Sequence, residues 1–132
     1  ILSSYNQSLS EALGVKKKME LDFNLHQKSF KAIDNSSGLS NSNTIFTYEQ
    51  NGSLVFGKYQ GGEIEFGNIV GKFILPNTVE LLFQCKTISN ELLSGNSRGK
   101  IKKTKNGKLG ILFEWQWHVG SSGSGNSYHE QV

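Results

Sequence analysis

Two tryptophans near the C-terminal end of the sequence are the side chains best suited to recognising a small molecule. Alternate side chains of a strand point to the same face. Phe113, Trp115 and Trp117 therefore share one face of an expected strand with Ile111 and Val119. In a small barrel, such a face either lines a cavity for a small, largely apolar or amphipathic ligand or fills the core with its rings. The sequence leaves both readings open.

A second segment, 79–87, has the same alternation, and its apolar face includes Phe83 and Cys85. We expect this face to point to the same interior as the tryptophans. A buried indole N–H needs a hydrogen-bond partner, which indicates that Thr87 or Tyr59 also points inward. The predicted ligand-binding residues are Trp115, Trp117, Phe113, Phe83, Tyr59 and Gln84.

Glu114 and Gln84 lie on the faces opposite these aromatic residues. The pattern favours an exposed Glu114 on the outer wall. If a bulge or a different register reverses the faces, both side chains enter the interior. Glu114 would then be a buried carboxylate that could act as a general base in a cofactor-free isomerase or cyclase. The face that Glu114 occupies separates the ligand carrier from this enzymatic alternative.

No metal site or cofactor is predicted from the remaining reactive side chains. His26, His118 and His129 are far apart in the sequence, and nothing in their spacing indicates a shared metal, although three strands could bring them to one barrel end. Cys85 is the only cysteine, which excludes an internal disulfide framework and a thiolate zinc cluster. The pair Gly61-Gly62 precedes a strand, so it cannot form a phosphate cradle at a helix N-terminus.

Short apolar segments separated by turn residues must position these side chains. Two Asn-Gly pairs, at 51–52 and 106–107, are strong signals for tight hairpins. Glycines also fall inside several strands, where a curved wall needs bends or close approaches. We therefore expect an all-β fold, an antiparallel up-and-down meander of about eight strands that closes, or nearly closes, into a barrel. A two-sheet sandwich or an open sheet is the alternative. The expected strands cover 30–33, 44–49, 54–59, 63–75, 79–88, 91–103, 108–119 and 127–132.

The 132 residues suit one domain. We expect an N-terminal extension, 1–22, of extraneous or variable origin with a short helix over 8–13, followed by a single barrel domain, 23–132. The net charge of +3 comes almost entirely from lysine, and Arg98 is the only arginine. Nucleic-acid readers usually depend on arginine, so no nucleic-acid partner is expected.

No stretch reaches the roughly 18 apolar residues of a membrane helix, so we expect no membrane partner and a cytoplasmic location. Exposed apolar residues such as Leu82 and Leu112 would allow barrel walls to pair, which makes a homo-oligomer the other non-enzymatic prediction.

A set of short motifs is spread over about residues 26–131. They are Phe46-x-Tyr48-x-Gln50-x-Gly52, Tyr59-x-Gly61-Gly62-x-Ile64, Gly67-x-x-x-Gly71, Glu91-Leu92-x-x-Gly95, Gly107-Lys108-Leu109 and Glu114-Trp115-x-Trp117. Together they resemble a family of small bacterial proteins whose members are often labelled "N-acetylglutamate synthase". The resemblance implies an avidin- or lipocalin-like barrel of uncharacterised role.

The residues themselves do not predict acetyl transfer. An acetyl-coenzyme A site needs a glycine-rich loop that opens a helix, or a cluster of arginine and lysine, to hold the phosphates. No glycine-rich run here precedes a helical pattern, and the lysines between Lys100 and Lys108 flank a hairpin. We therefore expect no acetyl-coenzyme A binding and no N-acetylglutamate synthesis.

Overall fold

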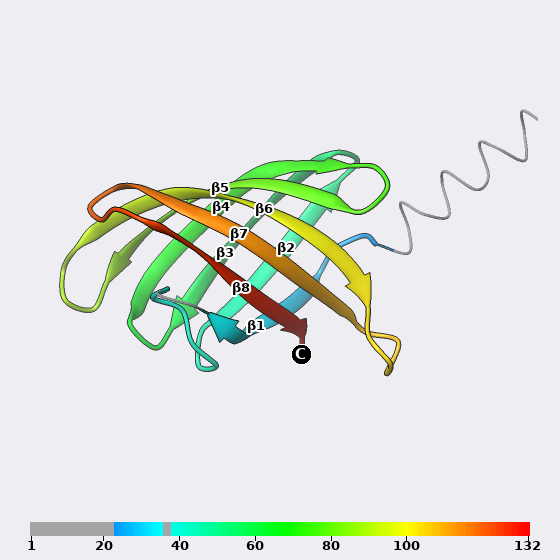
Figure 1. Ribbon diagram of the computed structural model, residues 1–132, viewed down its shortest axis with the longest axis horizontal. Coiled ribbons are helices and arrows are strands. Elements are labelled where there is room, and N and C mark those ends of the chain that lie inside the picture. The colour runs from blue at the N-terminus through cyan, green and yellow to red at the C-terminus, as the bar shows by residue number, and fades with distance from the viewer. Residues whose placement is uncertain (1–22, 36–37) are drawn as a thin grey trace, which may run out of the picture.

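The computed structural model describes residues 23–35 and 38–132 and contains eight antiparallel strands in this part of the chain (Figure 1). The extension 1–22 and the helix expected over 8–13 lie outside the described residues. The strands are β1 (Lys28–Asn35), β2 (Ile45–Asn51), β3 (Leu54–Gly61), β4 (Ile64–Ile74), β5 (Thr78–Thr87), β6 (Leu92–Lys103), β7 (Leu109–Val119) and β8 (Ser124–Gln131).

The eight strands form a closed barrel in which each strand pairs with the next one in the chain. β1 also pairs antiparallel with β8, where Ala32 lies opposite His129, and this pairing closes the circle. The prediction of an all-β, up-and-down barrel is therefore confirmed, and the sandwich and the open sheet are excluded. Closure matters because it removes the free sheet edges that would otherwise expose unpaired backbone groups.

Both Asn-Gly pairs form the expected hairpins. Gly52 connects β2 to β3 with φ of 61°, and Gly107 lies between β6 and β7 with φ of 76°. This left-handed region carries a steric cost for residues with a Cβ atom, and glycine reaches it freely. The local sequence thus sets both the position and the geometry of these turns.

The core follows the alternation of each strand, with inward side chains buried and outward side chains exposed. At the end of the barrel that carries the β2–β3 turn, the segment before β1 folds inward and Leu25 is completely buried. The Leu25 backbone N–H donates to Oε1 of Gln50 at 2.9 Å, so this buried backbone donor is satisfied. The segment closes one end of the barrel.

Two strand glycines make room for aromatic rings that reach the interior. A Cβ atom at Gly67 in β4 would overlap the ring of Tyr59, which lies opposite it in β3. A Cβ atom at Gly95 in β6 would lie within 3 Å of the ring of Phe83 in β5. These contacts confirm that close approach is the reason for glycine at both positions.

One predicted inward residue, Val119, is 59% exposed instead. The pairing of β6 with β7 shifts at Ser94 and Gly95: Gly95 lies opposite Trp117, but Ser94 lies opposite Val119. His118 is therefore an extra residue in β7, which forms a bulge. A bulge inserts one residue and turns the following side chain to the other face of the sheet. The prediction for Val119 was wrong because simple alternation ends at this bulge.

Candidate functional site

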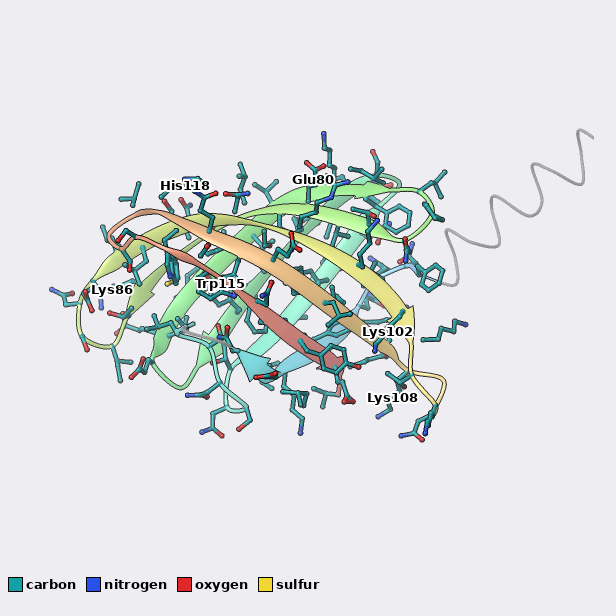
Figure 2. The ribbon with its side chains drawn as sticks, in the orientation of Figure 1. Glu80, Lys86, Lys102, Lys108, Trp115 and His118 are labelled. Carbon is teal, nitrogen blue, oxygen red and sulfur yellow. The ribbon has the colours of Figure 1, made fainter. Side chains whose placement is uncertain are left out.

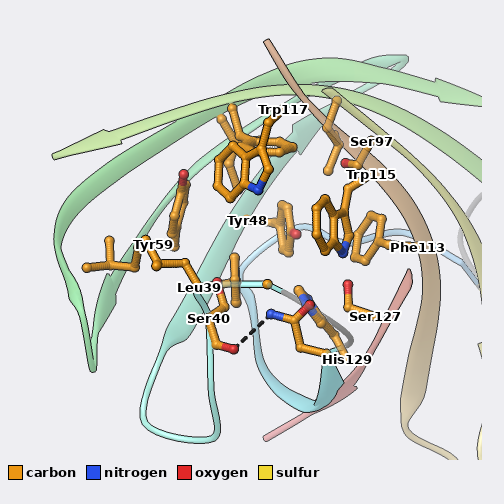
Figure 3. A pocket seen from close by; sticks show the side chains of 17 residues that line it. Leu39, Ser40, Tyr48, Tyr59, Ser97, Phe113, Trp115, Trp117, Ser127 and His129 are labelled. Carbon is orange, nitrogen blue, oxygen red and sulfur yellow. Dashed lines mark hydrogen bonds between the residues drawn. The ribbon is translucent and has the colours of Figure 1, made fainter. Parts of the chain in front are cut away.

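A cavity of about 70 Å³ lies inside the barrel, toward the end at which the β1–β2 connection enters the lining (Figure 3). Gly38, Leu39 and Ser40 of this connection form part of the lining, together with side chains from the surrounding strands. A water molecule needs at least roughly 10–15 Å³ of such space. The cavity therefore accommodates a few water molecules or one small flat molecule.

Aromatic rings make most of the cavity wall. Phe46 and Tyr59 stack with ring centroids 5.0 Å apart and an angle of 17° between the ring planes. Trp117 contacts Phe83 edge to face at 5.5 Å and Trp115 at 5.8 Å. These separations match favourable aromatic pairs, so the rings hold one another in place. The result is a rigid, largely apolar enclosure.

Trp115 supplies a hydrogen-bond donor to this enclosure. Its side chain is buried, and its indole Nε1–H has no hydrogen-bond partner among the described residues. Figure 3 shows the indole nitrogen directed toward the side of the cavity where His129 and Ser127 lie. A buried donor without a partner costs about 1–3 kcal/mol. A ligand or a water molecule that accepts this hydrogen bond would recover that free energy.

His129 on β8 faces the cavity between two phenylalanines. The centroid of its ring lies 4.4 Å from that of Phe46 and 4.9 Å from that of Phe113. Burial in this apolar surrounding lowers the pKa of His129 to about 4, so its imidazole is neutral at pH 7. Its Nδ1 is buried and has no partner within the described part of the chain.

Asn35 at the end of β1 contributes a hydrogen-bond acceptor. Its Nδ2 donates to the backbone carbonyl of Ser40 at 2.8 Å, which fixes the orientation of the amide. Its Oδ1 is buried and lacks a partner among residues 23–35 and 38–132. A Cβ atom at Gly38 would overlap this amide, so the absence of a side chain at Gly38 leaves the space that Asn35 occupies.

Two tyrosines complete the polar part of the wall. Tyr48 is almost completely buried, and burial raises its pKa far above the ordinary value. Burial also raises the pKa of Tyr59, with a smaller contribution from Cys85, whose thiol is hydrogen-bonded to the Tyr59 hydroxyl. Both phenols are therefore uncharged at neutral pH, like His129.

A family model described as avidin-like protein matches residues 23–132, which is most of the chain. This chain belongs to the avidin-like protein family. No curated protein matches this avidin-like chain, and no solved structure matches it either. The label "N-acetylglutamate synthase" gains no support from these comparisons. The matched range coincides with the segment that forms the closed barrel and its aromatic cavity.

Most of the residues predicted from the sequence meet at the cavity of this avidin-like barrel. The exception is Gln84, which is exposed on the outer face of β5, because β5 keeps a regular alternation through Phe83 and Cys85. Gln84 therefore lies outside the cavity. The predicted residues that do line it are Trp115, Trp117, Phe113, Phe83 and Tyr59.

Glu114 is also exposed on the outer wall of the avidin-like barrel, where it lies opposite Arg98 of β6. The alternation of β7 is regular up to Trp117, so no shift turns Glu114 inward. The enzymatic alternative required this carboxylate inside the barrel. Its position on the outer wall removes the proposed general base from any ligand in the cavity.

The three histidines of the avidin-like chain lie in different places. His26 accepts a hydrogen bond at Nδ1 from the backbone N–H of Gln50 at 3.0 Å, and the same nitrogen lies 3.2 Å from Oε2 of Glu49. His118 is hydrogen-bonded to Asn96 on the outer wall, and His129 faces the cavity. Within residues 23–35 and 38–132, no group of three metal-ligating side chains comes together. In the same described ranges, no helix is long and apolar enough to cross a membrane.

The polar side chains of the site, apart from Tyr59, were missed by the sequence analysis. Ser127 and His129 alternate along β8, and this period could have assigned them to one face together. Tyr48 could have been found in the same way from its spacing with Phe46. Asn35 gave no such signal, because it lies where β1 runs into a loop.

Proposed function

We propose that this avidin-like barrel binds a small, largely apolar ligand in its interior. One observation carries the proposal: three buried polar atoms without partners among the described residues belong to Asn35, Trp115 and His129, which all line a single aromatic cavity. Buried polar groups are nearly always hydrogen-bonded, so three exceptions at one cavity call for an explanation. A bound molecule that pairs with them explains the cluster, and ligand sites usually combine apolar walls with a few such polar anchors.

Phenol is a suitable first probe, because it combines a flat ring with one hydroxyl group that both donates and accepts. We expect phenol to bind saturably and to shift the indole N–H resonance of Trp115 in a ¹⁵N-correlated NMR spectrum. The variant Trp115→Phe identifies this resonance. Binding should also raise the melting temperature of the protein.

Two variants make this test specific. Ser97 lines the cavity, so Ser97→Leu should fill it and abolish the phenol response, whereas Gln84→Ala on the outer wall should leave the response unchanged. A thermal melt of each variant confirms that it is folded. The interior site would be refuted if phenol changed the NMR chemical shifts of residues on the outer wall, or if its chemical-shift changes persisted in folded Ser97→Leu.

Self-association is a second candidate function, and it is favoured by an apolar strip on the outer wall. This strip consists of Phe56, Val70 and Leu82, which lie opposite one another on β3, β4 and β5 and are 43%, 52% and 61% exposed. Exposed apolar groups that gather in this way are typical of interaction surfaces.

The charges beside the apolar strip favour a second copy of this chain as the partner. Lys72 lies opposite Glu80, and Glu80 pairs with Arg98 at 2.7 Å, so the surface beside the strip carries both signs. Such a surface can complement its own copy, as a two-fold symmetric dimer requires. Sedimentation velocity at tens of micromolar should then show a dimer, and a monomer at every concentration would contradict this candidate.

A further inference from the structure

Among the described residues, the lining of the cavity contains no charged side chain. None of its residues is Asp, Glu, Lys or Arg, and its ionisable members are Tyr48, Tyr59 and His129. Burial holds all three in their neutral forms at pH 7. A buried charge without a partner of opposite sign is strongly disfavoured. The cavity is therefore suited to an uncharged molecule and would reject a carboxylate or an ammonium group.

Two of the unpaired atoms have unambiguous hydrogen-bonding roles. Indole Nε1–H of Trp115 can only donate, so it needs an acceptor on the ligand. Oδ1 of Asn35 is a carbonyl oxygen and can only accept, and the hydrogen bond from Nδ2 to the Ser40 carbonyl fixes which end of the amide is the oxygen. The complementary molecule therefore carries at least one acceptor and one N–H or O–H donor. His129 Nδ1 offers a third contact, as donor or acceptor according to its tautomer.

The ring geometry indicates a flat molecule. The nearly parallel stack of Phe46 on Tyr59 and the ring of His129 against Phe46 present aromatic faces and edges to the interior. Offset stacking and edge-to-face contacts with such rings favour another aromatic ring over a bulky aliphatic one. The small volume excludes a long chain from the enclosed part of the cavity.

We propose that the cavity binds an uncharged heteroaromatic molecule that offers both a hydrogen-bond donor and a carbonyl-type acceptor, matched to Asn35 and Trp115. This inference rests on the proposed function and narrows it to one chemical class. The pyridones are the simplest probes of this class: 2-pyridone has its N–H and C=O on neighbouring ring atoms, and 4-pyridone has them on opposite sides of the ring.

The test compares these probes with three small ring molecules that differ from them in hydrogen-bonding groups or in charge. N-methyl-2-pyridone loses the donor, toluene loses both polar groups, and benzoate adds a negative charge. Dissociation constants come from NMR titrations that follow backbone amides of β8. At least one pyridone should bind more tightly than all three comparison molecules. The margin over N-methyl-2-pyridone should be about fivefold or more, because the methyl group leaves Oδ1 of Asn35 unpaired.

A pair of tryptophan variants assigns the donor. Trp115→Phe keeps an aromatic ring but removes the unpaired N–H, and it should weaken pyridone binding about fivefold or more while toluene binding changes little. Trp117→Phe is the matched control, because the Trp117 indole is not among the unpaired buried donors. It should affect pyridone and toluene to a similar extent. Melting curves verify that both variants are folded.

The outcomes separate this inference from the proposed function. If toluene or N-methyl-2-pyridone binds at the cavity as tightly as the pyridones, or if benzoate binds more tightly, the chemical class is wrong and the interior site stands. The proposed chemical class of the ligand would also be wrong if Trp115→Phe and Trp117→Phe weakened pyridone binding equally. If phenol, toluene and both pyridones all fail to bind, the proposed function itself fails.

Discussion

His129 shows how one buried side chain can make the stability of this protein depend on pH. Its ring packs between Phe46 and Phe113, and the described residues that line the cavity include no carboxylate to balance a positive charge. The folded protein therefore binds a proton at this site only near pH 4, whereas the unfolded chain binds it near the ordinary pKa of 6.5. Between these values the unfolded state holds more protons, so acidification favours unfolding.

We expect the protonation of His129 to lower the free energy of unfolding of the protein by about 2 kcal/mol between pH 7 and pH 5. Below about pH 4 both states are protonated and the loss levels off near roughly 3 kcal/mol. Urea denaturation of the native chain and of His129→Gln at both pH values isolates this contribution, because the two proteins differ only at this side chain. If the two proteins lost equal stability on acidification, His129 would not be the responsible group.

At the scale of the strand, a glycine lets the side chain of a neighbouring strand pack directly against the barrel wall. Gly67 on β4 is buried beneath the ring of Tyr59, which in turn stacks on Phe46. A methyl group at this position would push the ring toward the cavity. The absence of a side chain at Gly67 thus leaves the space in which Tyr59 of β3 stacks on Phe46 of β2.

Gly67→Ala should destabilise the protein by about 1–3 kcal/mol, because an added methyl group in a packed interior forces the surrounding side chains to shift. Chemical denaturation measures this change. Asn68→Ala is the matched control, since Asn68 is the next residue on β4 but is exposed on the outer wall, and it should change stability by less than about 0.5 kcal/mol. Equal effects of the two substitutions would contradict the proposed packing role of Gly67.

At the scale of the whole molecule, the outer wall carries charged side chains such as Glu80 and Lys86 (Figure 2) and also exposed apolar side chains. Leu82 belongs to the apolar strip with Phe56 and Val70. Leu112 is similarly exposed, at 50%, but it lies on β7 opposite Lys100 and Tyr128. Only Leu82 is therefore continuous with other exposed apolar side chains on the neighbouring strands.

Leu82→Lys should weaken self-association at least about tenfold, because it would bury a charge between the paired strips. Leu112→Lys adds the same charge outside the strip and should have little effect. Sedimentation velocity over a concentration series compares both variants with the native chain. If Leu112→Lys dissociated the dimer as strongly as Leu82→Lys, the effect would reflect net charge and not the strip.

Local patterns in the sequence determined the strands, both Asn-Gly turns and the inward face of β7 as far as Trp117. These features depend on the period of two and on backbone preferences of single residues, which act between near neighbours in the chain. The closed barrel was predictable for the same reason: about eight consecutive strands joined mostly by tight turns leave few other ways to bury the apolar faces.

Only the tertiary structure decided which polar atoms meet in the cavity. Asn35 and His129 are brought to one cavity by the pairing of β1 with β8, which joins segments almost a hundred residues apart. The bulge that exposes Val119 depends on how β7 is matched to β6. Local sequence preferences do not encode such long-range register, because it is set by the combined packing of all eight strands.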